Sequence, residues 1–284
     1  MFNYKRFLLE KLSDSVLEYY MLDWDNNILN MSSIIHVDYF QDGKWIPKDL
    51  SSSEFAEIRT LIRKRNDEDQ TGWGLRNNNY DDTFDSFRDN KNGISTFITD
   101  SLEAISKKSF GPVWNKFIKC IVDGNVFMII TARGHEPETI KYVVRWIIFN
   151  YITNKQRKIL EKNLRKFNVM FDFDDSNLDF EQLIENYLEK CDFIGINSKF
   201  FKEKFGKTGK STTAEHYKAI AIRYFTEKIN NFGLRIGKKV KVGFSDDDSI
   251  TIQHVYKYMK NELSLDFPID YHVYHTKDGE IIEL

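Results

Sequence analysis

Three short, mostly apolar runs, each followed at once by polar side chains, constrain the fold of this chain more than any other feature. They are residues 16–22, 126–130 and 239–244, and the residues that follow them are Asp23, Thr131 and Ser245. Runs of this length are typical of strands buried on both faces of a sheet. Segments of helical periodicity separate them. Strands that alternate with helices in this way predict an α/β fold with a mainly parallel sheet.

The length of the chain predicts one large core with added segments. At about 150 residues per domain, 284 residues exceed one ordinary domain, and 41% hydrophobic residues suffice for a sizeable core. We assign residues 1–31 and 110–284 to the core, with an insert at about residues 154–207. Residues 32–109 form the other unit. There, the turn at residues 41–44 predicts a β-hairpin flap, and the remainder predicts a mostly helical cap.

Local signals predict further elements. A capping box predicts a helix over residues 51–65, and a second one at residues 212–215 begins another helix. We also predict a strand near residues 168–173. Residues 66–93 are rich in Asn and Asp, and we interpret them as a partly irregular segment. We expect its isolated aromatic side chains to pack this segment against the rest of the protein.

Charge and cysteine content exclude several classes of protein. The chain has 41 Lys and Arg against 43 Asp and Glu, a formal net charge of −2. No protein-wide field therefore attracts nucleic acid or an anionic membrane. The two cysteines, Cys120 and Cys191, are too few for a disulfide framework or a four-cysteine zinc site, which favours a reducing compartment.

The apolar segments predict a protein without a membrane partner. Charged residues interrupt residues 1–12, so this segment lacks the apolar region of a signal peptide. The other apolar stretches fall short of the ~20 residues that span a bilayer. We predict a cytoplasmic protein of unknown oligomeric state. The frequent Asn, Lys, Ile, Phe and Tyr suggest an AT-rich source such as a phage, for which the location would be the host cytoplasm or the virion.

The polar residues after the strands are expected to meet. Ligands bind at the carboxyl ends of strands in a parallel sheet, which would gather Asp23, Asp25, Asp246 and Asp247. The first two share one face of the extended chain, because the intervening side chain points to the other. Clustered carboxylates repel one another unless a cation neutralises them. Oxygen ligands together with a substrate phosphate favour Mg²⁺.

The order of these segments resembles a known superfamily. Leu22-Asp23-Trp24-Asp25, then Ile130-Thr131-Ala132-Arg133, then a lysine on a helix and finally Phe244-Ser245-Asp246-Asp247 are similar to the four motifs of haloacid dehalogenase phosphohydrolases. The resemblance covers about half of the chain. It implies a Rossmann-like core and a Mg²⁺-dependent phosphatase that hydrolyses phosphomonoesters.

The resemblance also implies a role for each matching residue. Asp23 would be the nucleophile that forms an aspartyl-phosphate, and Asp25 the general acid and base. Thr131 would bind the transferring phosphoryl group. The metal ligands would be Asp23, the carbonyl group of Asp25, Asp246 and Asp247, in covalent catalysis assisted by Mg²⁺.

Two cationic roles remain open at this stage. Lys218, on the helix before the last acidic strand, is our choice for the lysine that neutralises charge at the site, and Lys210 is the alternative. Arg133 resembles the Thr-x-Arg arrangement of polynucleotide-end phosphatases and could clamp a substrate phosphate, or it could form a structural ion pair. With the lysines of residues 199–210, these cations favour a nucleotide or a nucleic-acid end as substrate.

Two residues depart from the superfamily pattern. Asn26 and Asn27 stand where a Gly and a Thr are usual. Asn tolerates left-handed backbone geometry, so Asn26 can replace the glycine. Asn27 motivates the alternative hypothesis, a catalytically weak or inactive protein of the same fold that serves in binding or assembly, for example in a phage.

Overall fold

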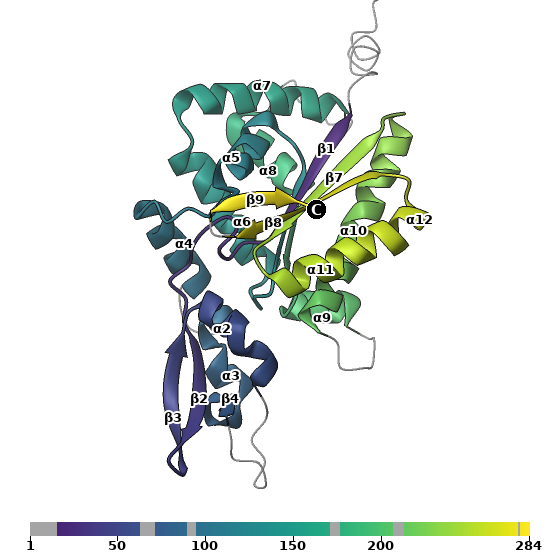
Figure 1. Cartoon of the computed structure of the whole chain (residues 1–284). Coiled ribbons are helices and arrows are strands. Elements are labelled where there is room, and N and C mark those ends of the chain that lie inside the picture. The colour runs from purple at the N-terminus through teal and green to yellow at the C-terminus, as the bar shows by residue number, and fades with distance from the viewer. Residues whose placement is uncertain (1–15, 63–71, 90–94, 171–176, 207–212, 278) are drawn as a thin grey trace, which may run out of the picture.

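A computed structural model describes residues 16–62, 72–89, 95–170, 177–206, 213–277 and 279–284. It has a broad α/β unit, called here the core, and a narrower extension formed by the described residues of 32–89, called here the lobe (Figure 1). Among the described residues, no helix combines the length and the apolar composition needed to cross a bilayer. Both cysteines are buried free thiols.

The core contains a six-stranded sheet in the order β6-β5-β1-β7-β8-β9. All neighbouring strands are parallel except β9, which pairs antiparallel with β8. The strands are β1 (Leu17–Leu22), β5 (Phe127–Thr131), β6 (Asp192–Gly195), β7 (Val240–Asp246), β8 (Asp270–Lys277) and β9 (Glu280–Glu283). The predicted α/β class and mainly parallel sheet are therefore confirmed.

Helices cover both faces of this sheet (Figure 1). On one face, Phe127 of β5 packs against Phe117 and Tyr187, which belong to α5 and α8. On the other, Tyr19 of β1 packs against Phe225 of α10. The core helices are α5 (Trp114–Asp123), α6 (Pro137–Trp146), η4 (Ile147–Tyr151), α7 (Asn154–Met170), α8 (Phe180–Leu188), α9 (Lys199–Phe205), α10 (Ala214–Arg235), α11 (Ser249–Tyr258), η5 (Met259–Leu263) and α12 (Ser264–Asp266).

The lobe is built on a separate antiparallel sheet in the order β3-β2-β4. The predicted hairpin is present, and its turn places Asp42 and Gly43 at positive φ. The elements of the lobe are β2 (Ile35–Gln41), β3 (Lys44–Leu50), α2 (Ser52–Ile58), η1 (Arg59–Leu61), β4 (Gly72–Leu75), η2 (Arg76–Asn78), α3 (Tyr80–Thr83) and η3 (Asp85–Phe87). The chain then returns to the core through α4 (Thr96–Ser106), which packs against α6.

The aromatic side chains of the lobe pack on one another. Phe84 contacts the rings of Phe55, Tyr80 and Phe87, with centroid distances of 5.5, 5.7 and 6.4 Å. These contacts agree with the interpretation that the aromatic residues serve packing. The expectation of a mostly helical cap is incomplete, because a three-stranded sheet forms its centre.

Two local predictions need correction. The helix expected over residues 51–65 ends at Ile58 and is followed by a short 3₁₀ turn to Leu61, and residues 63–65 lie outside the described residues. The strand expected near residues 168–173 is wrong for residues 168–170, which are the last of α7; the rest lies outside the described residues.

The second capping box also needs correction. The cap of α10 is Thr213, whose hydroxyl accepts the N–H of His216, whereas Thr212 lies outside the described residues. In addition, residues 154–207 supply β6, which pairs with β5 at the edge of the main sheet. The described part of this segment therefore contributes a strand to the main sheet.

Candidate active site

The turn after β1 directs two carboxylates to the same side. The register pairs Leu22 with Ser245, so Asp23 follows β1 beside the end of β7. Trp24 is fully buried against Phe97 and Phe117 on the opposite side. Asp23 and Asp25 consequently face the carboxyl edge of the sheet.

The two asparagines after Asp25 shape this turn. Asn26 has φ +53°, the left-handed conformation expected of a residue that replaces glycine. Its side-chain amide also donates to Asp247 at 3.2 Å. The fully buried Asn27 donates to the carbonyl of Asp23 at 3.0 Å and to Ser245, and accepts from Thr276 at 2.8 Å. Asn27 therefore ties together the ends of β1, β7 and β8.

Lys218 bridges two buried carboxylates. From the second turn of α10, its Nζ donates to Asp23 at 2.7 Å and to Asp246 at 2.6 Å. Its side chain is 4% exposed. Burial disfavours the ammonium, but the two carboxylates outweigh that effect and raise the pKa of Lys218. The structure thus places Lys218 at the site, whereas Lys210 lies outside the described residues.

A third carboxylate completes a cluster. Oxygen atoms of Asp23, Asp246 and Asp247 lie within 4.8 Å of one another. Burial, followed by repulsion from Asp246, raises the pKa of Asp247 to about 7. Burial likewise raises the pKa of Asp23, although Lys218 opposes the effect. Three close carboxylates served by one ammonium leave a site where a further cation is favourable.

Asp25 is not part of that cluster, because Arg133 holds it. The guanidinium Nε donates to one carboxylate oxygen of Asp25 at 2.8 Å, and an Nη atom donates to the other at 2.6 Å. Thr131 donates to Asp25 at 3.4 Å. As expected, Asp25 lies at the same edge of the sheet as the other acids. Its carboxylate, however, contacts Arg133 and is not part of the cluster of Asp23, Asp246 and Asp247.

The Arg133 guanidinium is fully buried between core and lobe. Ser33 accepts a hydrogen bond from it at 2.8 Å, and the Ser86 carbonyl another at 3.4 Å. The rings of Phe87 and Phe97 lie 4.1 and 5.6 Å from its central carbon. Of the two roles left open by the sequence, the structure shows the ion pair.

Two further contacts attach the lobe beside the site. On the side of β5, the N–H of Gly134 donates to Phe87 at 2.7 Å. On the side of β7, Arg59 forms ion pairs with Asp248 at 2.7 Å and Glu215 at 2.9 Å. Sequence reasoning missed Arg59 as well as Ser33, because each is an isolated polar residue in a segment without a motif.

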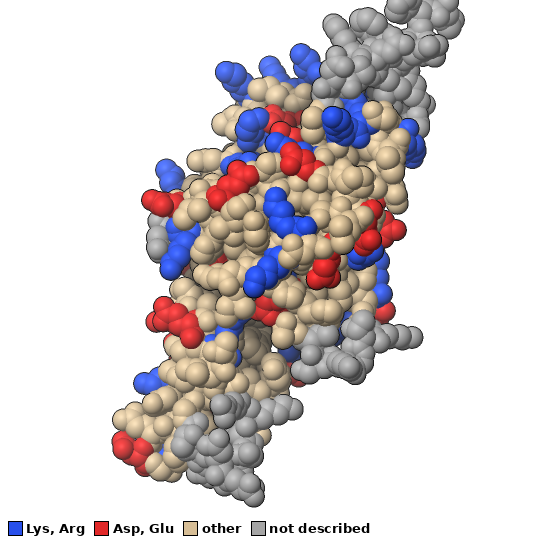
Figure 2. Space-filling view, turned by 45° about the vertical axis from the view of Figure 1, so that its right-hand side comes forward, with Lys and Arg blue, Asp and Glu red and all other residues tan. Residues whose placement is uncertain are grey.

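No single sign of charge dominates the face of the molecule drawn in Figure 2. Figure 2 shows Lys and Arg interspersed with Asp and Glu over the visible face, in agreement with the net charge of −2. Within the predicted lysine run, Lys199 pairs with Glu203 at 3.7 Å, and Lys204 lies 4.0 Å from the ring of Tyr224. Lys202 lines a cavity described below.

Comparison with known proteins adds no assignment. No protein-family model, no curated protein and no solved structure matches the chain. The functional argument rests on the geometry described above and on the motif order.

Proposed function

We propose that the protein is a Mg²⁺-dependent phosphomonoester hydrolase that acts through an aspartyl-phosphate. The observation that carries the proposal is the arrangement of Asp23, Lys218 and Asp246 at the carboxyl ends of β1 and β7. A buried carboxylate held by a buried ammonium is oriented and shielded from water, as a nucleophile requires. The resemblance to haloacid dehalogenase phosphohydrolases supports the same role for Asp23.

The donor set fits Mg²⁺. Asp23, Asp246 and Asp247 supply only oxygen ligands within a small space, and magnesium prefers carboxylates supplemented by water and substrate phosphate. The raised pKa of Asp247 indicates that its charge lacks sufficient compensation. When bound, the ion would neutralise charge on the phosphoryl group and orient it toward Asp23.

Four residues have separate roles in the proposed reaction. Asp23 attacks phosphorus while the bond to the leaving oxygen breaks, and Asp25 supplies a proton to that oxygen. Water then attacks phosphorus, Asp25 removes its proton, and the carboxylate of Asp23 is restored with release of phosphate. Lys218 stays beside Asp23 and offsets the developing negative charge, and Thr131 holds a phosphoryl oxygen.

Asp23→Asn tests the proposal. We expect the variant to lose phosphate release from a generic phosphomonoester in Mg²⁺, because an amide cannot replace the carboxylate nucleophile. Asp192→Asn is the matched control: Asp192 lies at the amino end of β6 and pairs with Lys228 at 2.5 Å. An Asp23→Asn variant with the wild-type rate would show that the nucleophile is assigned wrongly.

The substrate class that we propose is a nucleotide or a nucleic-acid end. Lys202 on α9, which lines a cavity near the carboxyl end of β5, and the Thr-x-Arg resemblance support it. A screen of phosphomonoesters that includes 3′- and 5′-phosphorylated oligonucleotides measures this preference directly.

One observation favours the second candidate function, a binding or assembly protein with this fold. Arg133 occupies both carboxylate oxygens of Asp25, so in the observed arrangement neither oxygen is free to contact a leaving group or a water molecule. If the full screen yields no Mg²⁺-dependent phosphate release, the non-enzymatic candidate replaces the phosphatase.

A further inference from the structure

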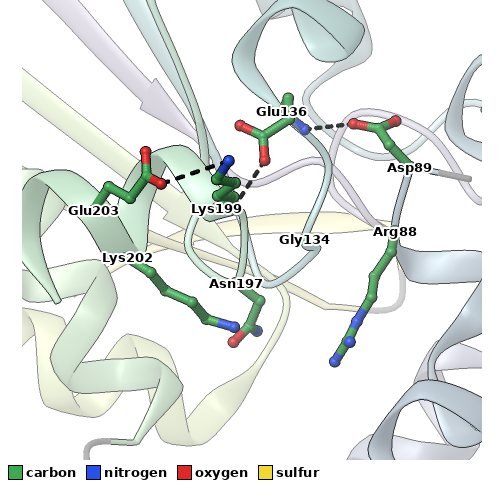
Figure 3. Close-up of a pocket in the computed structure, with 8 residues that line it drawn as sticks. All are labelled: Arg88, Asp89, Gly134, Glu136, Asn197, Lys199, Lys202 and Glu203. Carbon is green, nitrogen blue, oxygen red and sulfur yellow. Dashed lines mark hydrogen bonds and ion pairs between the residues drawn. The ribbon is translucent and has the colours of Figure 1, made fainter. Parts of the chain in front are cut away.

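A cavity lies at the carboxyl ends of β5 and β6, one strand away from the proposed nucleophile. Its volume is about 440 Å³, within the range of small-molecule sites. It is called here the β5–β6 cavity. Its lining comes from the loops after both strands, from α9 and from the lobe: Arg88, Asp89, Gly134, Glu136, Asn197, Lys199, Lys202 and Glu203 (Figure 3).

The three acidic residues of the cavity all have partners within the protein, and one of them, Glu203, pairs with Lys199 at 3.7 Å. Glu136 accepts the backbone N–H groups of Lys199 and Phe200 at 2.9 and 3.2 Å. Asp89 accepts the N–H of Glu136 at 2.8 Å and the hydroxyl of Thr139 at 3.0 Å. These bonds occupy oxygen atoms of both carboxylates and stabilise their negative charge with donors of the protein itself.

Two of the cationic residues, Lys202 and Arg88, have weaker contacts within the protein. Among the residues that the structure describes, the Nζ of Lys202 forms no ion pair or hydrogen bond. Arg88 pairs with Asp81, whose side chain is 75% exposed, so water competes for that contact. The two cations approach the opening from opposite sides (Figure 3).

The backbone of Arg88 is fixed in place. Arg88 forms a parallel β-bridge with Gly134. A Cβ atom on Gly134 would lie 3.2 Å from the Arg88 side chain and 3.2 Å from the Asn197 carbonyl oxygen. The absence of a side chain at Gly134 thus permits the lobe to approach the loop after β5, which orders one wall of the cavity before a ligand binds.

From these contacts we infer that the β5–β6 cavity binds a second phosphate of the substrate, on the leaving-group side of the phosphomonoester. Neighbouring strands are about 4.8 Å apart, so the ends of β5 and β6 lie roughly 5–10 Å from that of β1, a distance that one molecule with two phosphates can span. The molecule that carries both phosphates is a nucleoside bisphosphate or an oligonucleotide end. The inference rests on the proposed function for the identity of the first phosphate.

The test compares substrates with and without the second phosphate. The set contains a nucleoside monophosphate, a nucleoside 3′,5′-bisphosphate and a terminally phosphorylated dinucleotide, with kcat/KM measured in Mg²⁺. We expect Lys202→Ala to lower kcat/KM about 3-fold, and Lys202→Glu about 10-fold, for the two substrates with a second phosphate. The monophosphate should be unaffected. Lys204→Glu is the control, because Lys204 is on the same helix but packs over Tyr224.

A binding measurement separates this inference from the proposed function. A fluorescent dinucleotide that lacks the terminal phosphate is titrated without Mg²⁺, and anisotropy reports binding. Weaker binding by Lys202→Glu but not by Lys204→Glu supports the cavity even if no hydrolysis occurs. Equal losses in the two variants, or none in either, overturn it. If the Lys202 variants lower kcat/KM only for the dinucleotide, the second phosphate belongs to a nucleic-acid end. If they lower it only for the 3′,5′-bisphosphate, the second phosphate belongs to a free nucleotide.

Discussion

The site contains two buried ion-pair networks that differ in where their members come from. Asp23, Lys218 and Asp246 all belong to the core: Asp23 directly follows β1, Lys218 is on α10 and Asp246 is the last residue of β7. The pair of Asp25 with Arg133 depends also on the lobe, which contributes the hydroxyl of Ser33 and the ring of Phe87.

The proposed nucleophile, Asp23, is therefore held by the core alone, whereas the proposed acid and base, Asp25, is held by core and lobe together. The core network is set by strand register, so it persists wherever the sheet is intact. The Arg133 network also requires the lobe in its observed place, so the carboxylate of Asp25 is linked to the position of the lobe. In the proposed reaction, a movement of the lobe would change the contacts of Asp25 but not those of Asp23.

The largest effect is expected from breaking the core network. Lys218→Met leaves two buried carboxylates without their partner, and we expect a loss of about 3–5 kcal/mol in the free energy of unfolding and of all activity. Urea denaturation and a phosphatase assay measure both. Lys228→Met on the same helix removes a partly exposed pair with Asp192 and should cost less than about 1 kcal/mol. Equal losses in the two variants would contradict the special position of Lys218.

Breaking the lobe-dependent network should affect turnover of every substrate. Arg133→Met keeps an apolar side chain against Phe87 but releases Asp25, and we expect kcat to fall about 100-fold. Arg145→Met is the control, since Arg145 pairs with Glu185 at 2.6 Å and stacks on Phe149 away from the site. A loss confined to nucleic-acid substrates would instead indicate that Arg133 clamps a substrate phosphate.

The carboxylate cluster predicts a pH dependence in metal-free buffer. The pKa of Asp247 is about 7 in the folded state, against an ordinary value of 3.8. The folded protein therefore binds the proton more tightly, and stability falls as pH rises from about 4 to 7. We expect the stability of the wild type relative to Asp247→Asn to decrease by on the order of 3 kcal/mol over that window.

Chemical denaturation at several pH values in the presence of a chelator measures this difference. The pKa of Lys218 is raised above its ordinary value, so its charge stays constant across the same window. Addition of Mg²⁺ at pH 8 should raise the stability of the wild type more than that of the variant. If the difference in stability between the two proteins does not change with pH, the pKa of Asp247 is not raised by burial and by the neighbouring carboxylates.

The smallest effects concern the two asparagines. Asn27→Thr would introduce the usual residue of the superfamily, yet we expect it to destabilise the protein by about 1–3 kcal/mol, because buried groups of Asp23 and Ser245 lose donors. Asn26→Gly should change stability by less than about 0.5 kcal/mol, since glycine accepts the same positive φ. Thermal denaturation compares the two, and a reversed order would show that the turn depends on Asn26 rather than on Asn27.

Several features of the site could be predicted because they depend on local order along the chain. An apolar run followed by Asp23 and Asp25 predicts a strand and the exit of both side chains at its end, and the replacement of glycine by Asn26 follows from backbone preference alone. The sequence favours Lys218 over Lys210 as the lysine of the site only through its place on a helix. The carboxylates that Lys218 contacts follow from the structure alone. The failed strand near residues 168–173 shows the limit of local apolar content, because the helix of α7 continues through residue 170.

The sequence by itself determined the alternation of strands and helices, the mainly parallel sheet and the acids at its carboxyl edge, since these depend on period and order. Only the tertiary structure decided which carboxylate each cation meets. Lys218 lies 195 residues from Asp23, and Arg133 lies 100 residues from Ser33. Such contacts depend on strand order and on the docking of the lobe, where burial and charge compensation select the partner.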